Sequence, residues 1–181
     1  MKRTILHCDM NNYYATVEAK LNPELRGLPL AVCGSTEERH GIVLAKSYEA
    51  KKMGVRTGEA IFEARSKCPG LIIVPPNFEA YIRYSKEARE IYYNYTDRIE
   101  PFGIDECWLD LTGTEGLFGP PEEAAARIME DIREKLGLTI SVGISFNKIF
   151  AKLASDIAGR DQLFCIGEDF QKTIGPLPTN T

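Results

Sequence analysis

Residues 103–110, GIDECWLD, decide how this chain folds, because they place two adjacent carboxylates at the start of an apolar strand. Ile104, Trp108 and Leu109 are typical of a strand that enters a hydrophobic core. Asp105 and Glu106 stand at its entrance, where burying an unpaired charge is expensive. Paired carboxylates are common on solvated surfaces, so their position here indicates that the folded protein compensates them.

The composition is that of a globular protein. The 181 residues are 44% hydrophobic and 27% charged, which is enough chain for one compact unit or two small ones. The N-terminal stretch MKRTILHCD lacks the apolar run of a signal peptide. No run in the sequence approaches the roughly 18 apolar residues of a membrane span. We therefore expect a cytoplasmic protein without a membrane partner.

The cysteine and histidine contents and the net charge limit the kinds of binding site that the chain can carry. The five cysteines are odd in number and contain no C-x-x-C pair, which favours reduced thiols over a disulfide framework or a zinc site. With only two histidines in the sequence, a metal would be held by oxygen ligands. The net charge of −4 and the pI near 5.4 argue against a basic nucleic-acid-binding surface over the whole chain.

The apolar pattern predicts an α+β fold. Residues 4–9 and 138–145 alternate as strands, and residues 97–111 predict a hairpin whose turn contains Pro101 and Gly103. Residues 78–96 and 121–136 have the periodicity of helices. The order βαββαβ is the ferredoxin-like arrangement. Residues 11–77 then form an insertion between the first strand and the first helix.

The insertion has the signals of a small α/β lobe. A helix is expected after Asn11 or Asn12 as its cap, and another is expected after a cap at Thr57. A polar loop, GSTEERH, separates two of the predicted strands, which lie at 29–33, 41–45 and 71–74.

The predicted topology brings three carboxylates together. In the ferredoxin-like order the end of the first strand lies beside the start of the third, so Asp9 meets Asp105 and Glu106. Like charges about 4 Å apart cost about 4 kcal/mol per pair at an effective dielectric near 20. Protonation or hard divalent cations would relieve this. Adjacent strand residues face opposite ways, so the two neighbours share a site if the backbone bends near Gly103.

Four ordered motifs, CDMNNYY, SYEAKKMGV, GIDECWLD and ISFNKIFAKLASD, resemble the Y-family translesion DNA polymerases, close to the DNA polymerase IV group, over residues 4–166. The resemblance implies a catalytic palm from residues 1–10 and 78–166, fingers from 11–77, and the start of a thumb at 167–181. It also implies template-directed transfer of a nucleotide from a dNTP to a primer 3′-hydroxyl with two Mg²⁺, for which Mn²⁺ can substitute.

The same resemblance assigns roles to particular residues. Asp9 and Asp105 would bind both ions, Glu106 the ion nearer the primer, and the Met10 carbonyl could complete the ligand set. Tyr14 would be the steric gate beneath the sugar, and the alternative is a tyrosine of the helix core. The remaining nucleotide-binding candidates are Tyr13, Tyr48, Lys51 and Lys148; an isolated lysine at 148 would otherwise be a solvated surface charge.

Two positions depart from the family pattern around Tyr48. Ala45 stands where a threonine is usual, and Lys51 where an arginine is usual. Alanine cannot donate a hydrogen bond, and lysine offers a point charge in place of a fork of donors. Lys46 could compensate. Cys107 and Trp108 also replace the usual alanine and smaller aromatic residue, which we expect to alter packing more than chemistry.

The last residues, GPLPTNT, come where family members continue into a thumb and a DNA-gripping domain. We therefore expect a fragment that is weakly active or inactive by itself. Implied partners are primer-template DNA, a dNTP and a sliding clamp bound through the missing C-terminal region, in a nucleoid-associated cytoplasmic protein. Two alternatives remain: a palm-like nucleotide cyclase, and a non-catalytic palm used for protein binding.

Overall fold

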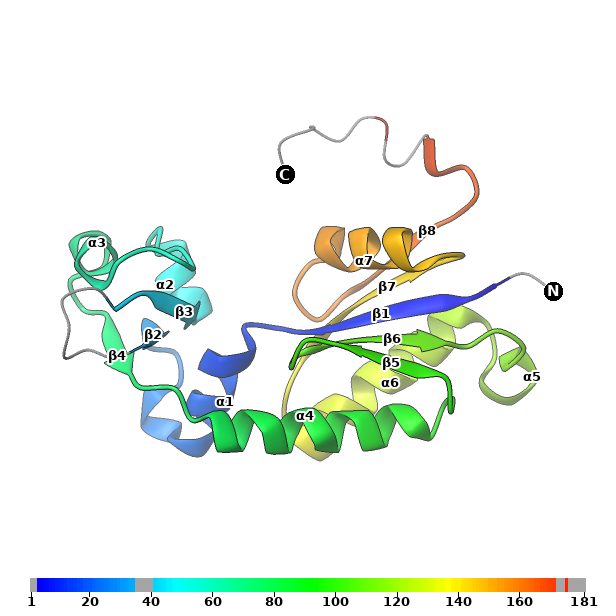
Figure 1. Cartoon of the computed structure of the whole chain (residues 1–181), viewed down its shortest axis with the longest axis horizontal. Helices are drawn as coiled ribbons and strands as arrows, with labels where there is room; N and C mark the ends of the chain where they lie inside the picture. Colours follow the sequence, from blue (N-terminus) through cyan, green and yellow to red (C-terminus); the bar gives the residue numbers. More distant parts are fainter. Residues whose placement is uncertain (1–2, 35–40, 172–174, 176–181) are drawn as a thin grey trace. The chain divides into compact units, whose positions relative to one another are not determined.

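The structure is a computed structural model that describes residues 3–34, 41–171 and 175. The chain divides into two compact units, drawn in Figure 1. The first unit combines Met1–Asn11 with Ser85–Thr181, and the second unit is Asn12–Tyr84. Helix α4 (Phe78–Tyr93) runs across the division. Most of the predicted loop 34–40 and the chain end beyond residue 171, apart from 175, lie outside the described residues.

The first unit is built on a five-stranded sheet in the order β5-β6-β1-β7-β8. Strand β1 pairs antiparallel with both β6 and β7, and β5 pairs antiparallel with β6. This is the strand order that the βαββαβ pattern predicted. Strand β8, which pairs parallel with β7, was not predicted. The strands are β1 (Ile5–Met10), β5 (Ile99–Phe102), β6 (Glu106–Asp110), β7 (Ile140–Ser145) and β8 (Leu163–Ile166).

Helices cover both faces of this sheet around β7. All six residues of β7 are buried, with α6 (Pro121–Leu136) and α7 (Lys148–Ile157) on opposite sides in Figure 1. Gly143 in β7 allows α7 to approach closely, because a Cβ there would lie 1.9 Å from the carbonyl oxygen of Ala151. A short helix, α5 (Glu115–Phe118), precedes α6. The core includes the fully buried side chains of Leu6, Leu109, Ile128, Ile132 and Ile140.

The second unit has a three-stranded sheet in the order β3-β2-β4, in which β2 pairs antiparallel with β3 and parallel with β4. Two small apolar clusters form its core, one of which contains Ala31, Val43 and Ala64 and the other Ala15, Leu30 and Val32. Its elements are α1 (Tyr13–Leu21), η1 (Pro23–Leu25), β2 (Leu30–Cys33), β3 (Val43–Lys46), α2 (Tyr48–Lys52), α3 (Ile61–Lys67) and β4 (Ile72–Val74).

Two local predictions were wrong. Thr57 does not cap a helix: α3 begins at Ile61, after Ala60, whose N–H donates to the Glu63 carboxylate over 3.3 Å. Pro101 lies within β5 and pairs with Cys107. Strand β5 is at the edge of the sheet, where proline is tolerated because one side of the strand needs no partner.

Two further features bear on the sequence predictions. All five cysteines are free, as expected, and four of them are buried. In the part of the chain that the structure describes, no helix combines the length and apolar character needed to cross a bilayer.

Candidate active site

The three predicted acids come together at one end of the five-stranded sheet, where β1 ends beside the start of β6. We call Asp9, Asp105 and Glu106 the acidic edge. Asp9, near the end of β1, is paired in register with Glu106, the first residue of β6. Asp105 lies in the turn before β6, and its carbonyl accepts a hydrogen bond of 3.1 Å from the N–H of Met10. Gly103 has φ of +79°, a left-handed conformation that favours glycine. The chain therefore bends where the sequence required it to bend.

The electrostatics of this edge show that the carboxylates act on one another. Burial, together with repulsion from Glu106 and Asp105, raises the pKa of Asp9 from 3.8 to about 7. Burial also raises the pKa of Asp105, and the Glu106 charge adds to the effect. Raised carboxyl pKa values mean that ionisation is costly here until a positive charge compensates it.

Lys152 supplies such a charge, and it was not among the predicted site residues. Its ammonium donates to the Glu106 carboxylate and to Asp156 Oδ1 (2.9 Å), and lies 4.0 Å from Asp9 Oδ2. Burial by itself would lower the pKa of Lys152, but the hydrogen bonds to Glu106 and Asp156 raise it to about 12. The available signal was the spacing of α7, which puts Lys148, Lys152 and Asp156 four residues apart on one side of a helix.

His7 is a second neighbour that sequence reasoning missed. Its ring is fully buried. The Ser155 hydroxyl donates to the Lys152 carbonyl (2.7 Å) and so accepts from the Nδ1–H of His7 (2.7 Å). The unprotonated Nε2 lies 3.8 Å from Glu106 Oε1 and has no hydrogen-bond partner among the described residues. Burial, reinforced by Lys152, lowers the pKa of His7 to about 4, so the imidazole stays neutral beside Glu106.

The donor chemistry of this edge fits a hard divalent cation. Carboxylate and carbonyl oxygens are the ligands that Mg²⁺ prefers, and the cost of ionising Asp9 falls when a cation is present. Among the residues described, however, no group of three or more His, Cys, Asp or Glu side chains is arranged to hold a metal ion. The ammonium of Lys152 stands at Glu106, one of the predicted ligands.

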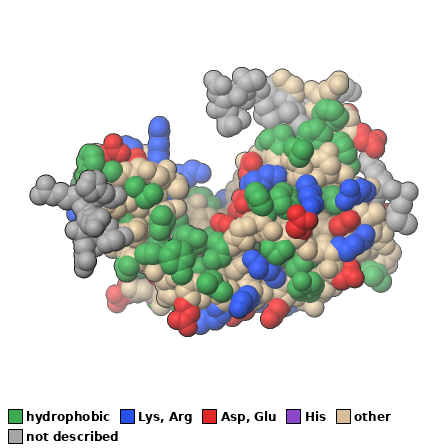
Figure 2. All heavy atoms as spheres, in the orientation of Figure 1, with side chains coloured by type: hydrophobic (Ala, Val, Ile, Leu, Met, Phe, Trp, Pro, Cys, Tyr) green, Lys and Arg blue, Asp and Glu red, His purple; other side chains and the backbone are tan. Residues whose placement is uncertain are grey.

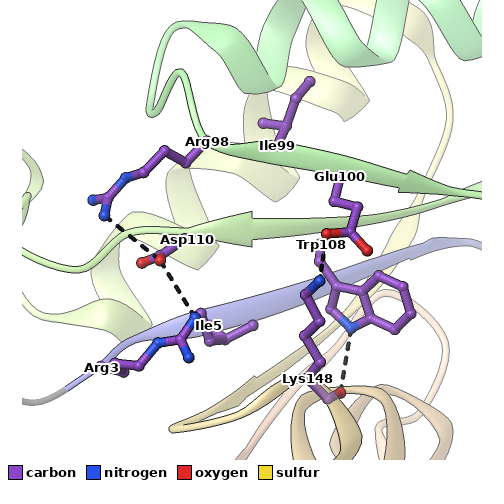
Figure 3. A pocket seen from close by; sticks show the side chains of 8 residues that line it. All are labelled: Arg3, Ile5, Arg98, Ile99, Glu100, Trp108, Asp110 and Lys148. Carbon is purple, nitrogen blue, oxygen red and sulfur yellow. Dashed lines mark hydrogen bonds and ion pairs between the residues drawn. The ribbon is translucent and has the colours of Figure 1, made fainter.

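Lys148 is the predicted nucleotide-binding residue of the first unit. It begins α7, and its ammonium pairs with Glu100 and lies 5.4 Å from the centre of the Trp108 ring. The indole N–H donates to the Lys148 carbonyl over 3.2 Å. Figure 3 shows these side chains in a cavity on the sheet, with Arg3, Arg98 and Asp110 at its other end. The lysine charge is therefore partnered within the chain.

The remaining predicted residues belong to the second unit. Tyr13 is buried, and its hydroxyl donates to the carbonyl of Tyr81. Tyr14 is partly exposed and stacks on the ring of Tyr81, with the ring centres 4.2 Å apart and the planes 6° from parallel. Tyr48 begins α2, and Lys51 is exposed on the same helix.

The visible face of the molecule carries charges of both signs. Figure 2 shows Lys and Arg side chains among Asp and Glu side chains on part of this face, and hydrophobic side chains gathered on another part. In the second unit the Lys46 ammonium donates to the Thr57 hydroxyl (2.9 Å). Burial, with Lys51 adding to it, lowers the pKa of Lys46.

The comparison with protein families identifies the chain. A profile of the impB/mucB/samB family matches residues 8–156, which include the acidic edge and all but the last residue of α7. The chain belongs to this family. Among the curated relatives, DNA polymerase IV of Acetivibrio thermocellus is 56% identical over 179 residues, covering 98% of this chain and 45% of that protein. DNA polymerase IV of Moorella thermoacetica is 42% identical over 177 residues, with 97% and 44% covered.

Solved structures of related polymerases share the fold. The insertion ternary complex of Dbh DNA polymerase superposes with a TM-score of 0.89 and 33% identity, over 97% of this chain and 52% of that chain. DinB from Sulfolobus solfataricus superposes with a TM-score of 0.86 and 33% identity, over 97% of this chain and 53% of that chain. The resemblance to Y-family DNA polymerase IV and the α+β fold with two sheets are thus confirmed. The chain spans about half the length of the curated relatives it matches.

Proposed function

We propose that this chain is the palm and fingers region of a translesion DNA polymerase, which transfers a nucleotide from a dNTP to a primer 3′-hydroxyl as directed by a template. The observation that carries the proposal is the convergence at the sheet edge. Asp9 and Glu106 are register partners on neighbouring strands, and Asp105 precedes Glu106 in the turn. The raised pKa of Asp9 supports a role that depends on a bound cation.

In this proposal the acids form the metal site. Asp9 and Asp105 would bind both Mg²⁺ ions, Glu106 would bind the ion nearer the primer, and the Met10 carbonyl would complete the set, with Mn²⁺ able to substitute. When bound there, divalent ions would supply the positive charge that lowers the pKa of the attacking hydroxyl and stabilises the departing pyrophosphate. The Met10 N–H holds the Asp105 carbonyl, which orients the turn that carries the acid. The fully buried His7 lies beneath Glu106.

The remaining roles concern the nucleotide. Tyr14 is proposed as the steric gate, since its ring is partly exposed and held flat against Tyr81. Tyr13, Tyr48, Lys51 and Lys148 are proposed to contact the nucleotide. The Lys148 ammonium would exchange Glu100, a mostly exposed partner, for a phosphate oxygen.

The proposed division is palm at 1–10 and 78–166, fingers at 11–77 and the start of a thumb at 167–181. Proposed partners are primer-template DNA and a dNTP, with a sliding clamp bound by the rest of the polymerase. The Dbh DNA polymerase has been solved as an insertion ternary complex and as a post-insertion binary complex. These relatives support the nucleic-acid substrate.

Primer extension tests the proposal. The assay uses a hybrid polymerase, in which this chain is continued by the C-terminal half of the Acetivibrio thermocellus enzyme. Asp105→Asn should nearly abolish dNTP incorporation, because it removes a metal-binding charge. Asp110→Asn, the same change at the far end of β6, should retain incorporation. Equal extension by the two variants, or a cyclic nucleotide as the product of the unmodified hybrid, would refute the proposed function.

A further inference from the structure

The Lys152 side chain lies among the proposed metal ligands. Its ammonium donates to Glu106, to Asp156 over 2.9 Å, and approaches Asp9 to 4.0 Å. Helix α7 places it there because Ser155, one turn from Lys152 on this helix, is bonded to the buried His7. The position of the ammonium is therefore set by the core.

The Lys152 ammonium and a divalent cation would compete for the same carboxylates. Without any positive charge, like-charged carboxylates about 4 Å apart would repel by about 4 kcal/mol per pair at an effective dielectric near 20. One ammonium offsets part of this repulsion. A divalent cation at the same edge would offset more of it, and would repel the ammonium at close range.

Asp156 gives the ammonium a second partner on its own helix. It lies four residues after Lys152, a spacing at which side chains of opposite charge meet. The Asp156 carboxylate is about half exposed, with 52% of its side-chain surface accessible, whereas the Glu106 carboxylate is 18% accessible. Lys152 can leave Glu106 and keep an ion pair at the helix surface.

We propose that Lys152 is an exchangeable counter-ion of the acidic edge: it holds Glu106 when no divalent cation is bound and pairs with Asp156 alone when one is bound. This inference rests on the proposed metal site. It assigns to Lys152 the control of that site's affinity for a divalent cation. The lysine keeps the acids compensated before the cation arrives, and its release reduces the net gain from binding the cation.

A Mn²⁺ titration of this chain, with free Mn²⁺ followed by its paramagnetic resonance signal, tests the role. Lys152→Met keeps the aliphatic stem and removes the charge, so it should tighten Mn²⁺ binding about tenfold, as expected for removing one nearby, partly screened positive charge. In a chelator, the melting temperature of this variant should fall below that of the unmodified chain. Added Mn²⁺ should recover the difference.

Matched variants separate this role from a general loss of charge. Lys135→Met removes another lysine from an ion pair with an aspartate four residues away, Asp131, and should leave the Mn²⁺ affinity unchanged. Lys152→Arg retains the charge, so it should bind Mn²⁺ as weakly as the unmodified chain does. This variant gives an answer even if Lys152→Met does not fold. Asp156→Asn should weaken Mn²⁺ binding when Lys152 is present and have a smaller effect in the Lys152→Met background.

The results distinguish a failure of the exchange role of Lys152 from a failure of the proposed metal site. If Lys152→Met and the unmodified chain bind Mn²⁺ equally, or if Lys152→Arg binds it as tightly as Lys152→Met does, the exchange role is wrong and the metal site stands. If Asp156→Asn has the same effect in both backgrounds, Asp156 acts through its own charge and is not the alternative partner. If the unmodified chain binds Mn²⁺ no better than Asp105→Asn does, the proposed metal site itself is wrong.

Discussion

Replacing Asp9 with asparagine should stabilise the metal-free chain at pH 8, although Asp9 is a proposed catalytic residue. Burial and the neighbouring acids raise the pKa of Asp9 from 3.8 to about 7. At 1.36 kcal/mol per pKa unit, that increase corresponds to about 4 kcal/mol of destabilisation once the carboxyl is ionised. The Asp9 side chain is 31% exposed, so solvent screening reduces the expected gain to about 1–2 kcal/mol.

The stabilisation expected from Asp9→Asn should increase with pH. Because the folded pKa of Asp9 is the higher one, its favourable contribution is fully present below about pH 4 and is lost as the pH rises through 7. The gain from Asp9→Asn in the free energy of unfolding should therefore be largest at pH 8 and disappear near pH 4. Urea denaturation in a chelator, at a series of pH values, measures it.

Asp110→Asn is the matched control, and its expected effect on the free energy of unfolding has the opposite sign. Burial of Asp110 is outweighed by hydrogen bonds from Thr112 and by the charges of Arg98 and Arg3, which lower its pKa. That variant should lose stability at pH 8. A destabilised Asp9→Asn at pH 8, or a gain that does not change with pH, would refute the electrostatic reasoning.

Four further predictions concern the nucleotide, the DNA and the fold. In the hybrid polymerase, Tyr14→Ala should raise the ratio of kcat/KM for a ribonucleotide over its deoxynucleotide by at least about tenfold, because it removes the ring that a 2′-hydroxyl would strike; an unchanged ratio in a folded variant would make Tyr14 a core residue. Tyr81→Leu should raise the same ratio by a smaller factor because it removes the stacked support of Tyr14, and Tyr81→Phe should not. This chain alone should bind primer-template DNA with a Kd of about 10⁻⁴ to 10⁻⁶ M at physiological salt, and tight, salt-resistant binding in a fluorescence titration would contradict that. Gly143→Ala should lower the free energy of unfolding by about 2–4 kcal/mol, since the new methyl group meets the backbone of α7, and a near-neutral result would show that α7 can move away.

The sheet of the first unit was predictable because its strands carry strong alternation and their order follows from a known arrangement. Asp9 and Glu106 become neighbours through that order alone. Strand β8 was missed because Leu163–Ile166 is short and pairs with β7 through contacts that no local pattern encodes. Its existence depends on α7 turning the chain back beside β7.

The surroundings of the acids were harder to predict. Lys152 and His7 are ordinary residues in the sequence, and their roles appear once α7 is placed against β1 and β7. A lysine on an amphipathic helix is usually a solvated charge. The register and tilt of the helix decide that Lys152 points at Glu106, and both depend on packing at Gly143.

In the proposed function the acidic edge exists for cation-dependent nucleotide transfer and not for stability. Two measurements test this together. One is single-turnover dNTP incorporation by the Asp9→Asn hybrid polymerase at pH 8 with saturating Mg²⁺. The other is the free energy of unfolding of this chain with the same substitution, metal-free at pH 8. We predict that incorporation falls by at least about a thousandfold, as for the loss of several kcal/mol of transition-state stabilisation, while stability rises. Incorporation near the unmodified rate by this folded variant would contradict the claim.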